Sequence, residues 1–269
     1  GVSVGSKEKH SEFNNPLLSS GGLTFSGNAR PIPQVRIGIP EYTVVPGTKG
    51  WLAFKGHIAY GIFTDDGWQK NFVAPGNKYT EHVLYHSKDL YVKIGNQEKF
   101  PLILEGGLEM AAQFGGNAFI GNEKIDMPNG IKDFFKVFIP SGGSSDTPLG
   151  EQLNIYGNHL GSWNFSLTWY APKNWTIRPY YEHYFEDHSQ MFGEYGWKDC
   201  LAGVEITFPK NPVIGSFVYE YISTKDQTGP VYWDHTPEIP EQVSGTDNYY
   251  NHYIYAGWQH WGMGIGNPL

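Results

Sequence analysis

Acidic and imidazole side chains gather in one stretch, residues 180–192, which reads YYEHYFEDHSQMF. Carboxylates and imidazoles can ligate a metal ion, and two carboxylates can hydrolyse a glycosidic bond. The stretch continues from residues 175–178, which begin an extended strand. Because side chains alternate between the two faces of a strand, Glu182 and His183 point in opposite directions. We therefore expect no metal site here.

A catalytic carboxylate pair needs a defined spacing. Glu182 and Glu186 share one predicted face, but four strand residues separate them by about 13 Å. Retaining glycosidases hold their carboxyl groups roughly 5.5 Å apart, and inverting ones about 9 Å. A partner from a neighbouring strand, such as Glu105 or Glu205, would restore that spacing. We expect no enzymatic activity, and a secreted β-rich glycoside hydrolase stays as an alternative.

The predicted strand has two different faces. The apolar face carries Ile177, Pro179, Tyr181, His183 and Phe185, and the polar face carries Arg178, Tyr180, Glu182, Tyr184 and Glu186. Such a strand forms half of a sandwich or one wall of a barrel.

The composition restricts the class of protein. The 269 residues include 19 basic and 27 acidic side chains, a net charge of -8, so a nucleic-acid partner is not expected. With a single cysteine, Cys200, no internal disulfide can form. The chain has 34 glycines and 16% aromatic residues, which favours strands and tight turns. No phosphate-binding, Ser/His/Asp or paired-cysteine motif occurs, and no cofactor is expected.

Alternating patterns predict further strands along the chain. They cover residues 51–64, 79–94, 102–114, 163–170, 200–208, 217–221 and 253–261, in addition to the strand that begins at residue 175. In residues 79–94, Lys88 falls on the apolar face, and a bulge near Ser87 would correct this. Four consecutive apolar positions, Trp163, Phe165, Leu167 and Trp169, alternate with polar ones, so we expect them to face lipid.

The connections between these strands alternate in length. From Asp65 onward, long and short connections follow each other without exception. In a meander, this places all long loops at one end and all tight turns at the other. Long extracellular loops and short periplasmic turns are typical of outer-membrane barrels. We therefore predict one all-β domain over residues 1–269, an antiparallel up-and-down transmembrane β-barrel.

The barrel hypothesis assigns roles to individual residues. The lumen is expected to be lined by Lys55, His57, Glu105, Glu109, Gln113 and Glu205. Trp68, Tyr195, Trp197 and Trp233 lie in long loops, where aromatic rings can stack on sugars or anchor the loops. The long loop 115–151 contains residues 131–138, a possible short helix or plug that needs burial of its phenylalanines.

Several motifs together resemble the Wzi-type capsule assembly family, in its Bacteroidota branch. They are GNARPIPQ at residues 27–34, EGGLE at 105–109, residues 156–163 around Gly157-Asn158-His159, and residues 180–192. The resemblance spans essentially the whole chain. It implies an outer-membrane barrel of roughly eighteen strands that holds capsular polysaccharide as a lectin, and it brings no catalytic residue. Since we count about ten strands, we expect a piece of a longer barrel.

The predicted function is thus a lectin-like barrel in the outer membrane of a Gram-negative bacterium, with capsular polysaccharide and membrane lipid as partners. An outer-membrane porin for sugars or oligosaccharides is the first alternative. The candidate polysaccharide-binding residues are Arg178, Tyr180, Glu182, Tyr184, Glu186, Tyr195, Trp197, Trp68 and Trp233.

Overall fold

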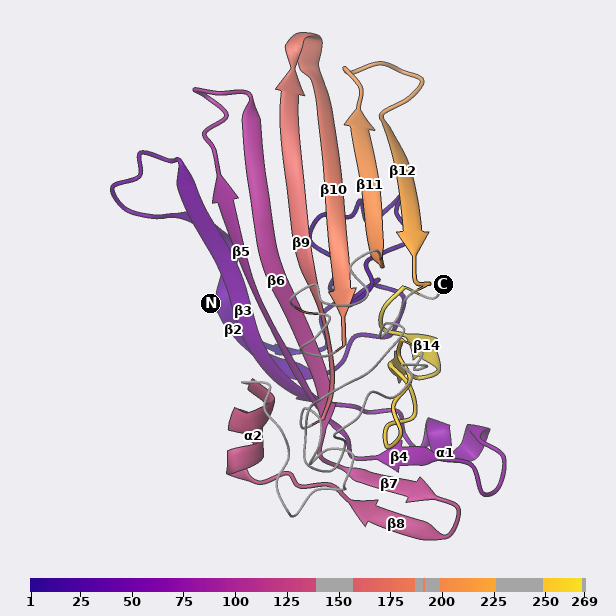
Figure 1. Ribbon diagram of the computed structural model, residues 1–269. Helices are drawn as coiled ribbons and strands as arrows, with labels where there is room; N and C mark the ends of the chain where they lie inside the picture. The colour runs from indigo at the N-terminus through magenta and orange to yellow at the C-terminus, as the bar shows by residue number, and fades with distance from the viewer. Residues whose placement is uncertain (139–156, 187–190, 192–198, 226–248, 268–269) are drawn as a thin grey trace, which may run out of the picture.

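The main element of the computed structural model is an antiparallel nine-stranded sheet, and the structure describes residues 1–138, 157–186, 191, 199–225 and 249–267 (Figure 1). The strands follow one another in the order β1, β2, β3, β5, β6, β9, β10, β11 and β12. They span Val2–Gly5, Gln34–Val44, Leu52–Ile62, Leu84–Ile94, Leu102–Phe114, Asn158–Ala171, Trp175–Phe185, Cys200–Thr207 and Ser216–Ser223. Each strand pairs with its neighbour along the chain, and the sheet is open rather than closed into a barrel.

Short and long connections lie at opposite ends of this sheet (Figure 1). The short ones are residues 45–51, 95–101, 172–174 (the 3-10 helix η1, Pro172–Asn174) and 208–215. The long ones are residues 6–33, 63–83, 115–157 and 186–199. The predicted alternation of connection lengths is therefore confirmed up to residues 208–215, and we call the two ends the short-turn end and the long-connection end. The last predicted long connection, 223–251, leads to no further strand of this sheet within the described residues.

The two faces of the sheet differ in chemistry. Apolar side chains on one face, here called the outer face, remain 40–78% exposed on seven strands, as Val4, Ile37, Ile58, Leu90, Leu104, Leu167 and Phe217 illustrate. The alternate positions, on the inner face, are mostly polar and include the buried Glu109, Ser162, Asn164 and Glu182. The pattern is thus inverted relative to a soluble sheet, which buries its apolar face.

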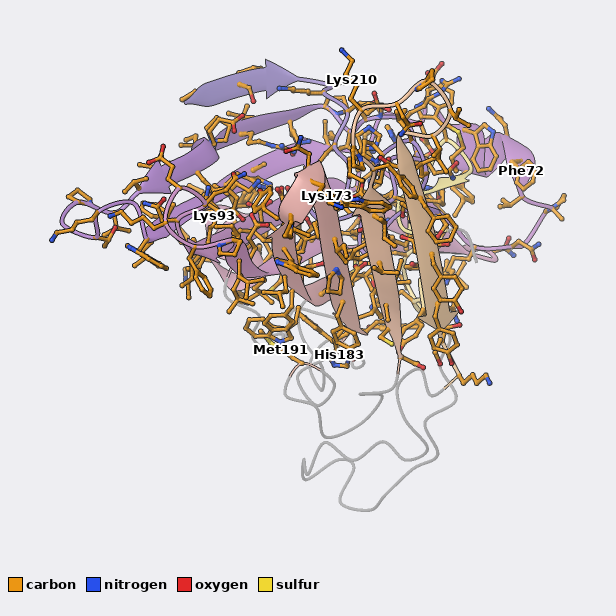
Figure 2. The ribbon with its side chains drawn as sticks, turned by 90° about the horizontal axis from the view of Figure 1, so that it is seen from above. Phe72, Lys93, Lys173, His183, Met191 and Lys210 are labelled. Atoms are coloured by element: carbon orange, nitrogen blue, oxygen red, sulfur yellow. The ribbon has the colours of Figure 1, made fainter. Side chains whose placement is uncertain are left out.

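The inner face is covered by two segments that are far apart in the sequence. The N-terminal segment, residues 6–33, and the C-terminal segment, residues 249–267, contribute Phe13, Leu23, Trp258 and Ile265 to one buried cluster with sheet residues such as Tyr85. Viewed from above, the strands curve around the covered side (Figure 2). The core of the molecule therefore lies on the inner side of the sheet.

Small elements pack at the long-connection end. Helix α1 (Trp68–Phe72) precedes β4 (Tyr79–Glu81), which joins β7 (Asn117–Ile120) and β8 (Glu123–Asp126) in a three-stranded sheet. The expectation of one strand over residues 79–94 is wrong, because the chain breaks at His82, with a φ of 58°, and passes into a different sheet. Residues 253–261 are also no strand of the main sheet, since only the short hairpin of β13 (Gln259–His260) and β14 (Met263–Gly264) forms there.

Helix α2 (Ile131–Phe138) lies against the outer face. Its Phe134 and Val137 pack with Tyr60 and Phe114, whose side chains point outward. Lys88 also points outward, and its ammonium donates to the Phe138 carbonyl at the end of the helix. Strand β5 pairs with both neighbours in unbroken register, so the bulge expected near Ser87 is absent. The lysine is tolerated because the helix terminus accepts its hydrogen bond.

The expected plug, residues 115–151, is thus described only in part. Its residues 117–126 form β7 and β8, its helix lies on the outer face, and residues 139–151 lie outside the described part of the chain. The inner face is covered by the N-terminal and C-terminal segments instead.

Candidate functional site

The inner face of β10 carries the polar residues that the sequence singles out. Arg178 forms an ion pair with Glu205 across the β10–β11 pair. The Tyr180 hydroxyl donates to Glu220 at 2.6 Å, and the Tyr184 hydroxyl donates to Glu186 at 3.4 Å. These side chains share one face, as the alternation predicts.

Glu182 lies at the centre of this wall and is 3% exposed. Its carboxylate accepts hydrogen bonds from the backbone N–H groups of Leu23, at 2.9 and 3.0 Å, and of Thr24, at 3.3 Å. Gly22 lies close by, since a Cβ there would be 3.0 Å from the carboxylate and would collide with the Ser11 hydroxyl. Glu182 therefore anchors the N-terminal segment to the sheet.

A second anchor is a buried charge cluster around Lys9. Its ammonium lies 3.0 Å from Asp89 and 3.0 Å from Glu109, and the His57 ring lies 2.8 Å from Asp89. Burial lowers the pKa of Lys9, but the carboxylates of Glu109 and Asp89 outweigh it and raise that pKa above its ordinary value. Lys9 thus stays charged and holds the segment against β5 and β6.

Further contacts continue along the N-terminal segment. Lys55 pairs with Glu12, and the Asn15 amide donates to Glu205 at 2.7 Å. Glu220 on β12 accepts hydrogen bonds from Ser19 and from the amide of Asn14. Carboxylates on β5, β6, β10, β11 and β12 therefore all bind this one segment.

The C-terminal segment adds a third set of contacts at the long-connection end. The Tyr250 hydroxyl donates to the Leu23 carbonyl at 2.6 Å, and the Trp258 indole donates to the Thr24 carbonyl at 3.1 Å. Gln113 donates to the Gly257 carbonyl at 3.1 Å. The two covering segments are therefore joined to each other as well as to the sheet.

All six expected lumen residues lie on the inner face, where each has a partner. The ion pairs or hydrogen bonds of five of them are given above, for Lys55, His57, Glu109, Gln113 and Glu205. The sixth, Glu105, accepts a hydrogen bond from Ser166. These residues fasten the covering segments or neighbouring strands together.

The expected polysaccharide-binding residues are not all on an accessible surface. Tyr180, Glu182 and Tyr184 are 5% exposed or less, because the covering segments lie over them. Tyr195, Trp197 and Trp233 lie outside the described residues. An inner-wall binding surface along β10 is therefore not open to a polymer in this structure.

Trp68 lies in a more accessible place. Its indole stacks on the Phe72 ring with 4.5 Å between centroids and 15° between planes. Phe72 is 71% exposed and lies at the periphery of the molecule (Figure 2). Trp68 was predicted as a binding residue and Phe72 was not, and together they form an aromatic pair that solvent can reach. Of the other predicted residues, Arg178 and Glu186 are partly exposed.

Sequence reasoning missed several site residues. Asp89 and Glu220 could have been found, because each falls on the inner face by strand alternation. Phe72 lies four residues after Trp68, the spacing of neighbours on a helix. Lys9 gave no signal, since its partners lie 80 and 100 residues away in the sequence.

Neither metal binding nor membrane-spanning helices are seen in the described part of the chain. There, no group of three or more His, Cys, Asp or Glu side chains could hold a metal ion. Among the same residues, no helix is both long and apolar enough to cross a membrane. His183 and Glu182 have separate partners, the Asp199 carbonyl and the Leu23 amide.

Comparison with known proteins adds no assignment: no family model matches this chain, and searches of curated proteins and of solved structures find no significant match.

Proposed function

We propose that this chain forms part of the wall of an outer-membrane β-barrel that holds capsular polysaccharide at the surface of a Gram-negative bacterium without catalysing a reaction. The proposal rests most directly on the contrast between the faces of the sheet. Large apolar side chains are exposed on the outer face of seven strands. Soluble proteins rarely expose a continuous apolar surface of this extent, whereas barrel strands direct such residues to lipid.

The free edges of the sheet support the barrel part of the proposal. Among the described residues, strands β1 and β12 each have a partner on one side only. Unpaired backbone groups are not tolerated in contact with hydrocarbon, so a lipid-exposed sheet needs further strands to close it. The short turns at one end and the long connections at the other match the arrangement of outer-membrane barrels.

The covered inner face favours retention of a polymer over diffusion through a pore. The N-terminal and C-terminal segments occupy the side of the sheet that would face a lumen. A porin for sugars or oligosaccharides needs that side open to water. Polymer binding is therefore expected at the long-connection end, outside the filled interior.

The accessible aromatic pair gives this end a means to bind sugars. Aromatic rings stack on the apolar faces of sugar rings, and polar groups nearby fix the orientation of the ligand. A long polymer can contact many weak sites at once, so retention can be strong although each site is weak. Trp68 with Phe72 is one such site in this proposal.

The experiment compares cell-attached and shed polysaccharide in the native host. A strain without the gene should shed capsule, and the parental gene should restore attachment. The variant Phe72→Ser should reduce attachment several-fold at an equal protein level in the membrane. Phe100→Ser is the matched control, since Phe100 is 49% exposed in a short turn at the opposite end. Normal attachment without the gene, or a large stable conductance of the purified protein, would contradict the proposal.

A further inference from the structure

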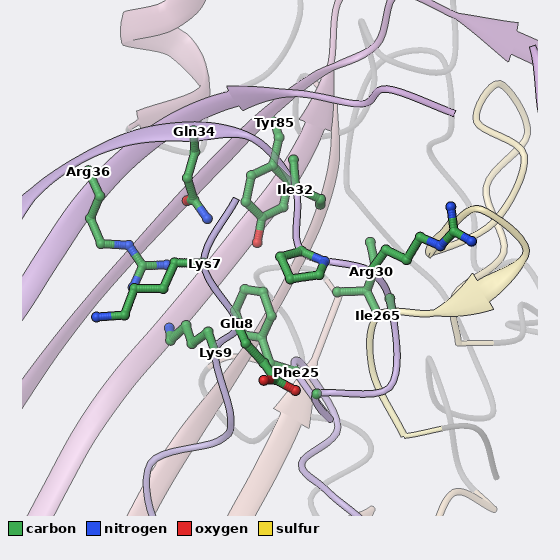
Figure 3. A pocket seen from close by; sticks show the side chains of 13 residues that line it. Lys7, Glu8, Lys9, Phe25, Arg30, Ile32, Gln34, Arg36, Tyr85 and Ile265 are labelled. Atoms are coloured by element: carbon green, nitrogen blue, oxygen red, sulfur yellow. The ribbon is translucent and has the colours of Figure 1, made fainter. Parts of the chain in front are cut away.

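A pocket lies between the N-terminal segment and the sheet at the long-connection end. Strand β2 contributes Gln34 and Arg36, β5 contributes Tyr85, and the N-terminal segment contributes Lys7 and Lys9 (Figure 3). Its remaining lining residues are Glu8, Phe25, Gly27, Ala29, Arg30, Pro31, Ile32 and Ile265. The pocket is partly open to solvent, and six of the eight residues of the GNARPIPQ motif at 27–34 line it.

The lining is basic although the whole chain carries a net charge of -8. The lining contains four basic side chains and one carboxylate, Glu8, which lies 3.7 Å from the His10 ring. The basic residues are Lys7, Lys9, Arg30 and Arg36. The charge of Lys9 is already neutralised by its ion pairs with Asp89 and Glu109 on the sheet. An anion in the pocket would therefore meet the other basic groups rather than Lys9.

Two of these basic groups are available to a ligand. Within the described residues, no ion pair joins Lys7 or Arg36 to a carboxylate, and Figure 3 shows both side chains beside the pocket. The Arg30 guanidinium instead lies over the Trp261 ring, 4.6 Å from its centroid. Arg36 can bind a carboxylate through two parallel hydrogen bonds, and Lys7 adds a second positive charge.

The other groups of the pocket suit a sugar rather than a bare ion. Phe25, Ile32 and Ile265 form an apolar floor and are 8% exposed or less. The buried Oε1 of Gln34 has no hydrogen-bond partner in the described part of the chain, so it can accept a hydrogen bond from a hydroxyl group. An apolar surface with a few orienting polar groups is the usual form of a small-ligand site.

From these observations we infer that the pocket binds an acidic sugar unit, with the carboxylate of the sugar on Arg36 and Lys7 and its ring against the apolar floor. This inference rests on the proposed function, because it makes the retained polysaccharide an acidic one. The local positive charge also offsets the repulsion that an acidic polymer would otherwise meet from a chain of net charge -8.

Calorimetric titration of the full chain, folded in detergent at fixed ionic strength, tests the pocket. The ligands are glucuronate, glucose and inorganic phosphate. Saturable glucuronate binding is expected, with glucose and phosphate at least tenfold weaker. Arg36→Gln should weaken glucuronate binding about tenfold, which corresponds to roughly 1.4 kcal/mol. Lys210→Gln removes the same charge from an exposed short turn and should leave binding unchanged.

Each other outcome overturns the inference. Equal binding of glucose would show that the basic groups do not select the ligand, and stronger binding of phosphate would identify a simple oxyanion site. Absence of saturable binding, or equal loss in Arg36→Gln and Lys210→Gln, would remove the site. Capsule attachment in cells separates this result from the proposed function: if Arg36→Gln loses glucuronate binding and the gene has no effect on attachment, the proposed function fails while the pocket stands.

Discussion

The outer and inner faces of the same nine strands are stabilised in different ways. On the outer face, side chains such as Leu90 and Tyr219 are more than half exposed and make no core. On the inner face, Glu109 and Glu182 are almost fully buried, and both bind the N-terminal segment. The inner face is thus held by specific buried polar contacts, while the apolar side chains of the outer face stay exposed, as the proposed contact with lipid requires.

The strongest test of the inner face is removal of the Lys9 charge. In Lys9→Met, the carboxylates of Asp89 and Glu109 lose their cation while they remain buried. Breaking a buried charge pair in this way costs about 3–5 kcal/mol. Denaturant unfolding in detergent should show this loss, and the double variant Lys9→Met with Glu109→Gln should recover part of it. A loss below about 1 kcal/mol in the single variant would show that the cluster does not hold the segment.

On the outer face, the strongest test is a charge at mid-strand. Leu167 is 40% exposed near the middle of the apolar surface. If this surface contacts lipid, Leu167→Arg should destabilise the membrane-inserted protein by about 2–4 kcal/mol. Val213→Arg, in the exposed turn 208–215, should have almost no effect. Equal effects of the two substitutions in lipid vesicles would refute the assignment of the outer face to lipid.

Acid should loosen the C-terminal segment through His252. Burial, followed by the charge of Lys78, lowers the pKa of this imidazole to about 3. In the unfolded chain, the histidine pKa is about 6.5, so between pH 6.5 and pH 3 the unfolded chain binds more protons than the folded one. The contribution of neutral His252 to stability is therefore complete above about pH 6.5 and is lost as the pH falls toward 3. The amides of Ile254 and Tyr255 donate to His252 Nδ1 and should exchange faster at pH 5 than at pH 7, after correction for intrinsic rates.

The matched variant for this titration is His252→Asn. Asparagine keeps an acceptor near the two amides but does not titrate in this range. Its exchange should therefore change little between pH 7 and pH 5. If parent and variant respond equally to acid, protonation of His252 is not the cause.

The smallest effect is expected at a single turn of the N-terminal segment. The side-chain Oδ1 of Asn15 accepts hydrogen bonds from the backbone N–H groups of Leu17 and Leu18, and its side-chain Nδ2 donates to Glu205. Asn15→Ala should cost about 1 kcal/mol and increase cleavage by a protease near residues 17 and 18. Asn211→Ala removes a turn of the same kind from residues 208–215 and should not alter this cleavage. Unchanged cleavage in Asn15→Ala would mean that this turn does not fasten the segment.

Strand alternation made the sheet and its faces predictable from the sequence. A period of two in residue type is a local property, so Leu167 and Trp169 separate from Ser166 and Thr168 without knowledge of the fold. Connection lengths can likewise be counted along the sequence, so the separation of short turns and long connections to opposite ends of the sheet was also predictable.

The remaining features depend on contacts between distant parts of the chain. Lys88 departs from the apolar pattern of the outer face because its ammonium donates to the end of helix α2. A short helix at residues 131–138 was predictable, but its position beside Lys88 was not. The covering of the inner face brings residues 6–33 onto strands up to about two hundred positions away, as the contact of Ser19 with Glu220 shows. Burial of the expected binding residues Tyr180 and Tyr184 follows from this covering and could not be predicted from their own strand.

Spin-label accessibility tests the central claim, lipid contact of the outer face, most directly. Single labels would be introduced by Ile37→Cys, Leu90→Cys, Leu167→Cys and Val213→Cys in a Cys200→Ser background, and the protein inserted into lipid vesicles. The first three positions lie on the outer face and are 40–62% exposed, and Val213 lies in a short turn and is 88% exposed. Lipid contact predicts frequent collisions with oxygen and few with a water-soluble nickel chelate at the three face positions, and the reverse at Val213. High nickel accessibility at all four positions, or low accessibility to both reagents at the three face positions, would contradict the account.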